Sequence, residues 1–359
     1  MLLDAHGNPI ESDGPEIHIP SAIFRKLYVA DEVANLLKRL PRREHETLRS
    51  LYERMLKQWP NRLQVKPSSI PSAGYLYDEF PNFWEPLHHI RRSIALCHDT
   101  YDPLEIAPML LLGPPWVGKT YFAREIARFL STEMKFISMA SLTAGWILSG
   151  ASSQWTWSRP GQVFESLVDG QYANPVIVID EIDKVRWEDA YDPLGALYSL
   201  LEHDTARHFV DEFAGVAIDA SQVIWIATAN DIRGIPEAIL NRLIVYHIQP
   251  PTPEQCEKIA QKLYQEFRSS YNWWKRFPPE LSPQALWMMR SISPRETRRA
   301  LRIAFWNARL AERIMIEPID FPKPEQKKIV GFGYWAPDWR GGGNNPVPQG
   351  GGPLILERA

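Results

Sequence analysis

The sequence predicts an α/β fold: a parallel-sheet domain, an all-helical lid domain after it, and an amphipathic helical segment before it. Three observations support this. Short apolar runs alternate with helical patterns between residues 75 and 249, which is typical of a parallel sheet covered on both faces. The first apolar run leads through a loop containing glycine into a helix. Residues 252–316 then show helical patterns alone.

Length and composition limit the function classes. The chain has 359 residues, 45% of them hydrophobic, and a formal net charge of −3, which excludes a strongly basic nucleic-acid coat protein. Its two cysteines, Cys97 and Cys256, lie far apart without a His/Cys cluster. We therefore expect no disulfide framework, no zinc site and a cytoplasmic location. Apolar runs stay well short of about 18 residues, and the N-terminus lacks a signal-peptide pattern, so no membrane contact is expected.

The chain divides into five segments. Residues 1–20 predict a flexible arm, and residues 21–66 a helical segment with apolar periodicity at Val33–Leu40 and Leu48–Trp59. Residues 67–249 form the predicted α/β domain and 250–316 the lid, in which Thr252/Gln255 and Ser293/Glu296 have capping-box spacing. Residues 317–359 are rich in Gly and Pro, which predicts a flexible tail.

Within the α/β domain, each predicted strand ends at polar residues or at glycine. The expected strands are Met109–Leu112, Val176–Ile179 and Val223–Ala227, and the expected helices are Tyr121–Leu130 and Leu194–Leu201. Ligands bind at the carboxyl ends of the strands in such sheets. The chemistry is therefore expected just after these strands.

The most specific motif is GPPWVGKT, which fits the phosphate-loop pattern G-x-x-x-x-G-K-[ST] between a strand and a helix. Backbone N–H groups and the helix N-terminus can then surround a polyanion. Lys119 would meet the β and γ phosphates, and Thr120 would bind Mg²⁺. The predicted ATP-binding residues are Gly113, Pro114, Pro115, Trp116, Val117, Gly118, Lys119, Thr120 and Tyr121. Trp116 stands where many such loops carry Gly, so we expect a tighter loop or weaker binding.

Polar residues after the next two strands complete the predicted site. Asp180 would hold Mg²⁺ and Glu181 would polarise the attacking water. Asp183 fits either this site or a helix cap. Asn230 follows another strand, where its amide would orient the water near the γ-phosphate; a polar residue that merely ends a strand is the alternative.

Arginines supply the remaining candidates. Arg242 would offset transition-state charge on a neighbouring subunit's γ-phosphate, and the alternative is a surface salt bridge. Arg295, in the first turn of a lid helix, would reach the γ-phosphate of its own chain. Arg298, Arg299 and Arg302 continue a basic face that we interpret as solvated helix surface.

These motifs together resemble an AAA+ ATPase, and most of all the ATPase module of the Lon protease family. The resemblance covers about residues 30–315. The strings that support it are GPPWVGKT (113–120), NPVIVIDEIDK (174–184), DPLGALYSLLE (192–202), FVDEF (209–213), IWIATAN (224–230) and IPEAILNRL (235–243).

The resemblance implies a role for each matched residue. Lys119 and Thr120 correspond to Walker A, and Asp180 and Glu181 to Walker B. Asn230 corresponds to sensor 1, Arg242 to the arginine finger and Arg295 to sensor 2. The family's substrate-gripping pore loop maps to residues 153–161, with Trp155 nearest the pore aromatic. Packing of Trp155 and Trp157 on a neighbouring helix is the alternative.

The prediction is a Mg²⁺-dependent ATPase that assembles into a ring of six and remodels or threads a protein partner. Lon proteases carry a proteolytic domain after the lid; here a Gly/Pro-rich tail follows, so we expect no protease activity. Pro71–Gly74 echoes the string around that family's catalytic serine, which we interpret as coincidence.

Two alternative functions stay open. One is a nucleic-acid-associated AAA+ regulator of the transposition or clamp-loader type, favoured by the basic Arg295–Arg313 helix and disfavoured by the net charge. The other is an ATP-locked scaffold with negligible turnover, which the Asp180–Glu181 pair argues against.

Overall fold

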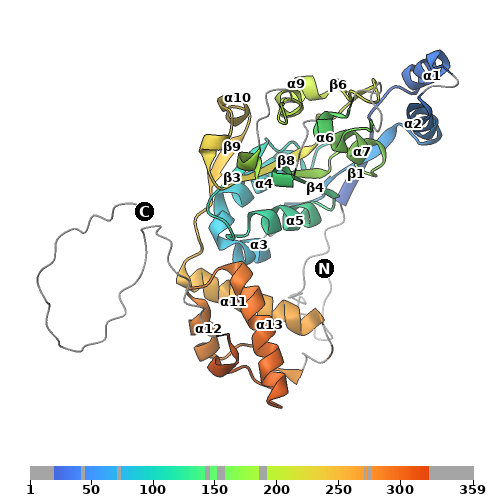
Figure 1. The fold of residues 1–359 in the computed structure, drawn as a ribbon. Coiled ribbons are helices and arrows are strands. Elements are labelled where there is room, and N and C mark those ends of the chain that lie inside the picture. Colours follow the sequence, from blue (N-terminus) through green and yellow to red (C-terminus); the bar gives the residue numbers. More distant parts are fainter. Residues whose placement is uncertain are drawn as a thin grey trace, which may run out of the picture. The chain divides into compact units, whose positions relative to one another are not determined.

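A five-stranded parallel sheet forms the centre of the α/β domain (Figure 1). The computed structural model describes residues 20–41, 45–70, 74–141, 146–151, 158–185, 192–270, 272 and 276–322. The strands are β3 (Met109–Leu112), β4 (Met134–Ser138), β5 (Val176–Asp180), β8 (Ile224–Ala229) and β9 (Ile244–His247). Their order is β4-β5-β8-β3-β9. Because β8 lies between β3 and β5, the ends of these three strands share one edge of the sheet.

Helices cover both faces of this sheet. They are α3 (Gly74–Glu79), α4 (Trp84–Cys97), α5 (Lys119–Phe129), α6 (Trp146–Ser149), α7 (Gln162–Val168), α8 (Leu197–Leu200), α9 (His203–Ala206) and α10 (Glu237–Leu240). Short 3-10 turns lie at Pro81–Phe83, Met139–Ser141, Ile182–Lys184 and Ile232–Gly234, and a small ribbon pairs β6 (Phe209–Val210) with β7 (Ala217–Ile218).

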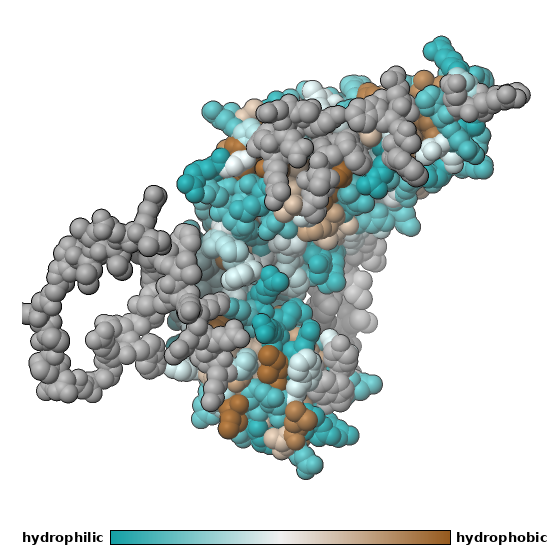
Figure 2. All heavy atoms as spheres, viewed as in Figure 1, coloured by the Kyte–Doolittle hydropathy of each residue, from teal (hydrophilic) through white to brown (hydrophobic). Residues whose placement is uncertain are grey.

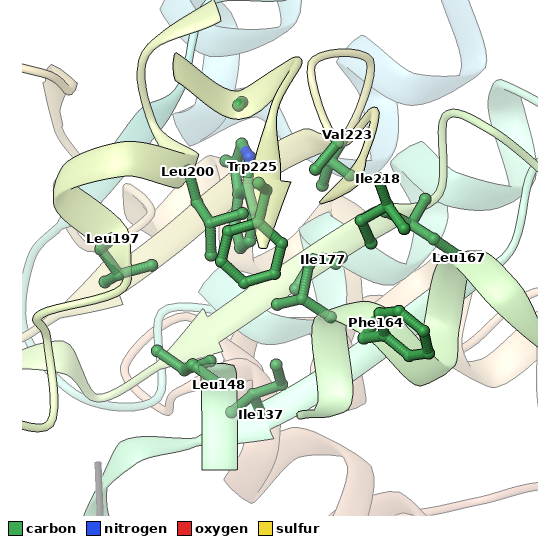
Figure 3. Packing of buried hydrophobic residues seen from close by; sticks show 14 of the residues in the cluster. Ile137, Leu148, Phe164, Leu167, Ile177, Leu197, Leu200, Ile218, Val223 and Trp225 are labelled. Atoms are coloured by element: carbon green, nitrogen blue, oxygen red, sulfur yellow. The ribbon is translucent and has the colours of Figure 1, made fainter. Parts of the chain in front are cut away.

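Successive strand residues point to opposite faces of the sheet and enter two separate cores. Ile177 of β5 packs in one core with α7 and α8, whereas the next residue, Val178, packs in the other with α4 and α5. Figure 3 shows Ile177 with Phe164 of α7 and Leu200 of α8 on either side. Burial on both faces explains the continuous apolar runs of β3, β5 and β8, and it confirms the predicted fold class.

The N-terminal segment differs from the prediction. Its two expected helices are present as α1 (Ala30–Arg39) and α2 (Glu46–Lys57), which lie beside one another in Figure 1. The helical interpretation of residues 21–66 was wrong at both ends, where β1 (Pro20–Lys26) pairs antiparallel with β2 (Asn61–Pro67). Tertiary pairing decides this: Leu63 bridges Tyr172, and the Asn174 side-chain carbonyl accepts the Val65 N–H at 3.0 Å.

The lid consists of α11 (Pro253–Ser270), α12 (Pro283–Met289) and α13 (Pro294–Leu310). Ser293 and Glu296 form the predicted capping box at the start of α13. The lid continues beyond the predicted boundary at residue 316, because the turn Pro318–Asp320 buries Asp320 and Phe321 packs in the lid core. The predicted arm up to residue 19 and the predicted tail from residue 323 onward lie outside the described residues.

The surface of the described residues is mainly hydrophilic on the face shown in Figure 2. In the part of the chain that the structure describes, no helix combines the length and the apolar character needed to cross a membrane.

Candidate nucleotide site

Strand register brings the motifs together. Leu112 pairs with Ala229, so the loop that begins at Gly113 starts beside Asn230. Ile179 pairs with Ala227, which places Asp180 beside Thr228. The Thr228 hydroxyl donates to the Asp180 carboxylate at 2.7 Å, and the Thr120 hydroxyl donates to the same oxygen at 2.9 Å. Thr228 therefore joins the site, although no sequence motif had pointed to it.

Two loop positions depend on backbone geometry that glycine allows. A Cβ at Gly113 would come within 2.2 Å of the Ile248 carbonyl oxygen, and Gly118 has a φ of +103°. Trp116 also lies in the left-handed region, with φ 68°, at a cost of about 1–2 kcal/mol for a residue with a side chain. The tryptophan at this position, where many phosphate loops carry glycine, therefore strains the backbone locally. Its side chain lines the cavity beside the loop.

Lys119 occupies the centre of the loop. Its ammonium group donates to the carbonyl oxygens of Gly113 at 2.7 Å and Pro114 at 2.9 Å, and to the side-chain oxygen of Asn230 at 2.9 Å. Burial lowers the pKa of Lys119, and the charges of Asp183, Asp180 and Glu181 act in the opposite direction. Lys119 is thus a buried cation that faces three carboxylates.

Glu181 has an unusual backbone. Its φ of 55° and ψ of 47° place it in the left-handed region, where non-glycine residues are uncommon and often belong to functional sites. Its N–H donates to the Thr228 hydroxyl at 3.1 Å, and its side chain lines the cavity. Asp183 is not a helix cap in the structure: it is nearly fully buried, pairs with the adjacent Lys184 at 3.3 Å, and neither carboxylate oxygen has a hydrogen-bond partner.

One cavity of about 850 Å³ unites most of the predicted residues. Predicted residues in its lining are 115–121, Asp180, Glu181, Asn230 and Arg295. The lid contributes further residues, including Ile259, Lys262 and Arg298. The volume lies within the range of small-molecule sites, and the polar groups converge at one end of the phosphate loop.

Arg242 lies apart from this cavity. Its guanidinium pairs with Glu202 at 2.7 Å, donates to the Ala238 carbonyl at 2.6 Å and sits 5.7 Å from the Tyr198 ring centre. The Nε atom is buried without a hydrogen-bond partner. Within its own chain Arg242 is therefore a salt-bridged residue outside the site.

The interpretation of Arg298 as solvated helix surface was incomplete, because its half-exposed side chain also makes specific contacts. Its guanidinium pairs with Glu266 at 2.9 Å and lies 5.9 Å from the Tyr121 ring centre, and the side chain lines the cavity. Arg299 is exposed, and Arg302 lies 5.9 Å from the Phe267 ring centre. The spacing of three residues from Arg295 to Arg298 places both on neighbouring positions of one helix face, which was the available signal.

The comparisons with known proteins agree with this geometry. Residues 109–249 match the family described as "ATPase family associated with various cellular activities (AAA)". The chain is 35% identical over 156 residues to the Lon protease of Campylobacter concisus and 38% identical over 149 residues to that of Helicobacter pylori. It therefore contains a Lon-like AAA+ ATPase module. It is also 29% identical over 228 residues to the peroxisomal Lon protease homolog 2 of Bos taurus.

These matches are partial in both directions. They cover 44%, 42% and 63% of this chain, but only 19%, 18% and 27% of the three Lon proteins. Among solved structures, the RuvB Holliday junction branch migration motor of Thermotoga maritima aligns with a TM-score of 0.45 and 15% identity. That alignment covers 67% of this chain and 66% of RuvB. Against the three Lon proteins, in contrast, this chain spans less than a third of the length of each.

The predicted pore residues Trp155 and Trp157 lie outside the described residues, but both flanks of their loop are held in place. The Ala151 N–H donates to the Arg159 carbonyl at 3.1 Å. The fully buried Asp211 carboxylate accepts the N–H groups of Gly161 at 2.8 Å, Phe213 at 3.0 Å and Ala214 at 2.9 Å. Asp211 therefore fixes one end of the loop to the segment before β7.

Asp211 should make stability depend on pH. Burial raises its pKa from 3.8 to about 6, against the lowering effect of its three N–H donors. The folded chain thus holds this proton more tightly than the unfolded chain, so the contribution of Asp211 to unfolding free energy falls as the pH rises from about 4 to 6. We expect the stability difference between wild type and Asp211→Asn to change by about 2 kcal/mol between pH 4 and pH 6, since each pKa unit corresponds to about 1.4 kcal/mol and the titration is incomplete at both ends of this range. Urea unfolding at several pH values measures it, and a pH-independent difference would exclude this titration.

Proposed function

We propose that the chain binds ATP with Mg²⁺ in the cavity, hydrolyses it, and uses the energy as a ring-forming motor that remodels or threads a protein partner. One observation supports the ATPase assignment most: a single cavity joins the phosphate loop, the Asp180–Glu181 pair, Asn230 and the lid residue Arg295. A cation, two carboxylates, an amide and an arginine of the lid are groups that recur in sites of phosphoryl transfer to water.

The loop and its neighbours would bind the polyphosphate. Lys119 would exchange at least one of its three present oxygen partners for a phosphate oxygen, because an ammonium group has only three donors. Thr120 and Asp180 fit Mg²⁺: their oxygens lie 2.9 Å apart at the edge of the cavity, and Mg²⁺ prefers oxygen ligands from few protein groups. The bound ion would neutralise phosphate charge.

The remaining groups would act on water and on charge. The Glu181 carboxylate would accept a hydrogen bond from the attacking water and polarise it. Asn230 would orient that water through its amide, since its side-chain oxygen already accepts from Lys119. Arg295, exposed in the first turn of α13, would contact the γ-phosphate from the lid.

Arg242 would complete a neighbouring subunit's site. It lies outside the cavity of its own chain, and its side chain is 26% exposed beside Glu202. We therefore propose a ring, most simply of six subunits, in which Arg242 leaves Glu202 to face the next subunit's nucleotide. The buried free thiols Cys97 and Cys256 suit the reducing cytoplasm that we propose for it.

Mixing two inactive variants tests action between subunits. Arg242→Ala and Glu181→Gln chains should each hydrolyse ATP slowly alone. In mixed rings some interfaces combine an intact Glu181 with an intact Arg242, so we expect partial recovery of activity. Phosphate release across a series of mixing ratios measures this, and the absence of recovery at every ratio would rule out the arrangement.

Trp155 is proposed to grip the protein substrate, because an exposed aromatic ring contacts any chain by apolar burial without reading sequence. We expect unfolded casein to stimulate ATP hydrolysis several-fold in the wild type and to have no effect on Trp155→Ala. Trp306→Ala, which removes an exposed tryptophan from α13 in the lid, is the matched control and should keep the stimulation. Full stimulation of Trp155→Ala would remove Trp155 from this role. Casein cleavage, measured in parallel, is expected to be absent.

A nucleic-acid-associated regulator remains the second candidate, because one observation favours it. Arg302 and Arg309 are exposed on α13, and neither pairs with a carboxylate among the described residues. Binding through such residues releases counterions and weakens steeply with salt. Stimulation of ATP hydrolysis by DNA, lost at higher salt and in Arg309→Ala, would favour this candidate over protein threading.

A further inference from the structure

A polar cluster centred on Tyr121 connects the phosphate-loop helix with the lid. The Tyr121 hydroxyl, on α5, lies 2.7 Å from a carboxylate oxygen of Glu79 on α3 and 3.2 Å from one of Glu266 on α11. Lys262 on α11 pairs with Glu79 at 2.7 Å, and Arg298 on α13 pairs with Glu266 at 2.9 Å. All five side chains line the cavity that holds Lys119 and Thr120.

The charges in this cluster balance. Two carboxylates face two cations, and the single phenol proton lies between the carboxylates. Because an ionised carboxylate can only accept hydrogen bonds, Tyr121 is the donor that allows Glu79 and Glu266 to approach one another. Without its hydroxyl, like charges would face each other across the boundary between α3 and α11.

Two aromatic rings and one carboxylate position the Arg298 side chain. Its guanidinium lies 5.9 Å from the Tyr121 ring centre and 5.6 Å from the Phe267 ring centre, and Nη2 donates to Glu266. Its side chain is 42% exposed, so the other donors of the planar fork stay accessible. A guanidinium fork in this state is suited to bidentate binding of a phosphate group.

We infer that Arg298 is a second phosphate-binding residue of the lid, and that Tyr121 and Glu266 are the residues that position it. This inference rests on the proposed nucleotide site and names a contact beyond Arg295. Since Tyr121 directly follows Thr120, the cluster also links the position of the lid arginine to α5, the helix that follows the phosphate loop.

Binding measurements on the full chain test the role of Arg298. In a Glu181→Gln background that keeps ATP intact, Arg298→Ala should weaken Mg·ATP binding about tenfold and leave adenosine binding unchanged, because one charge-assisted phosphate contact is lost. Arg298→Lys should fall between the two, since it keeps the charge without the fork. Arg299→Ala removes the neighbouring, exposed arginine and is the matched control.

Tyr121→Phe tests the positioning role. It keeps the ring under Arg298 and removes only the hydroxyl, so we expect about threefold weaker Mg·ATP binding. If Tyr121 acts through Arg298, the same substitution should have no further effect in Arg298→Ala, whereas a purely structural role would give additive losses. Thermal unfolding of each variant shows that it is folded.

The outcomes separate this inference from the proposed function. If Lys119→Ala loses Mg·ATP binding while Arg298→Ala binds as tightly as its background, the nucleotide site stands and the role of Arg298 is refuted. If the background itself binds no Mg·ATP, the proposed function fails first. Equal losses of ATP and adenosine binding in Arg298→Ala would also contradict a phosphate contact.

Discussion

Replacement of Lys119 by alanine should abolish nucleotide binding. Lys119 is the buried cation of the phosphate loop, with only 8% of its surface exposed. Its ammonium group donates hydrogen bonds to oxygens of Gly113, Pro114 and Asn230. A charged hydrogen bond in such a site contributes about 1.5–3 kcal/mol, and the loss of both charge and contact should weaken Mg·ATP binding at least about a hundredfold. Isothermal titration calorimetry with Mg·ATP measures the effect.

The control for this variant is Lys258→Ala, which removes an exposed lysine from α11. It should bind Mg·ATP as the wild type does. Thermal unfolding should show that Lys119→Ala is folded, because its former partners are groups that water can also satisfy. Wild-type affinity in folded Lys119→Ala would refute the assignment of the phosphate loop.

Replacement of Glu181 by glutamine should separate binding from hydrolysis. Glutamine has the same size as glutamate. The left-handed backbone at residue 181 should also persist, because its N–H still donates to the Thr228 hydroxyl, at 3.1 Å in the structure. It removes the carboxylate that would polarise water, and loss of such a group typically lowers the rate by about 10²–10⁴. We expect unchanged Mg·ATP affinity and a steady-state rate reduced by that factor, measured as phosphate release.

Glu237→Gln serves as the matched control, because Glu237 is exposed in the first turn of α10 and outside the cavity. It should hydrolyse ATP at the wild-type rate. A wild-type rate in Glu181→Gln would remove Glu181 from catalysis. Turnover of the wild type that is no faster than that of Glu181→Gln would instead support the ATP-locked scaffold.

The fold of the α/β domain was predictable because its strands are buried on both faces. Met109–Leu112 was predicted as a strand with the observed bounds, and β5 and β8 were displaced by at most two residues at an end. The strands β1 and β2 were missed for a physical reason. They form a two-stranded ribbon in which apolar and polar residues do not alternate clearly, since the neighbouring residues Ile23 and Phe24 are both exposed. The position of the ribbon depends on contacts with Tyr172 and Asn174, which are distant in sequence.

The candidate site was predictable at those positions where the expected chemistry calls for one particular residue type. Gly118, Lys119 and Asp180 follow from motif chemistry, and parallel register brings them to one edge of the sheet. Thr228 was missed because a threonine inside a buried strand is ordinarily explained by strand propensity; only its register opposite Asp180 reveals it. The place of Arg298 in the cavity lining was missed because it depends on contacts with Tyr121 and Glu266, which lie on elements far from α13 in sequence.

The central claim is that the cavity beside Lys119 binds ATP with Mg²⁺ and hydrolyses it. Inorganic phosphate released by the purified chain, with ATP and magnesium chloride and with or without unfolded casein, measures this directly. The account predicts steady release that stops when EDTA removes the magnesium and in Lys119→Ala. Release that never exceeds the rate of Glu181→Gln, under any of these conditions, would contradict it.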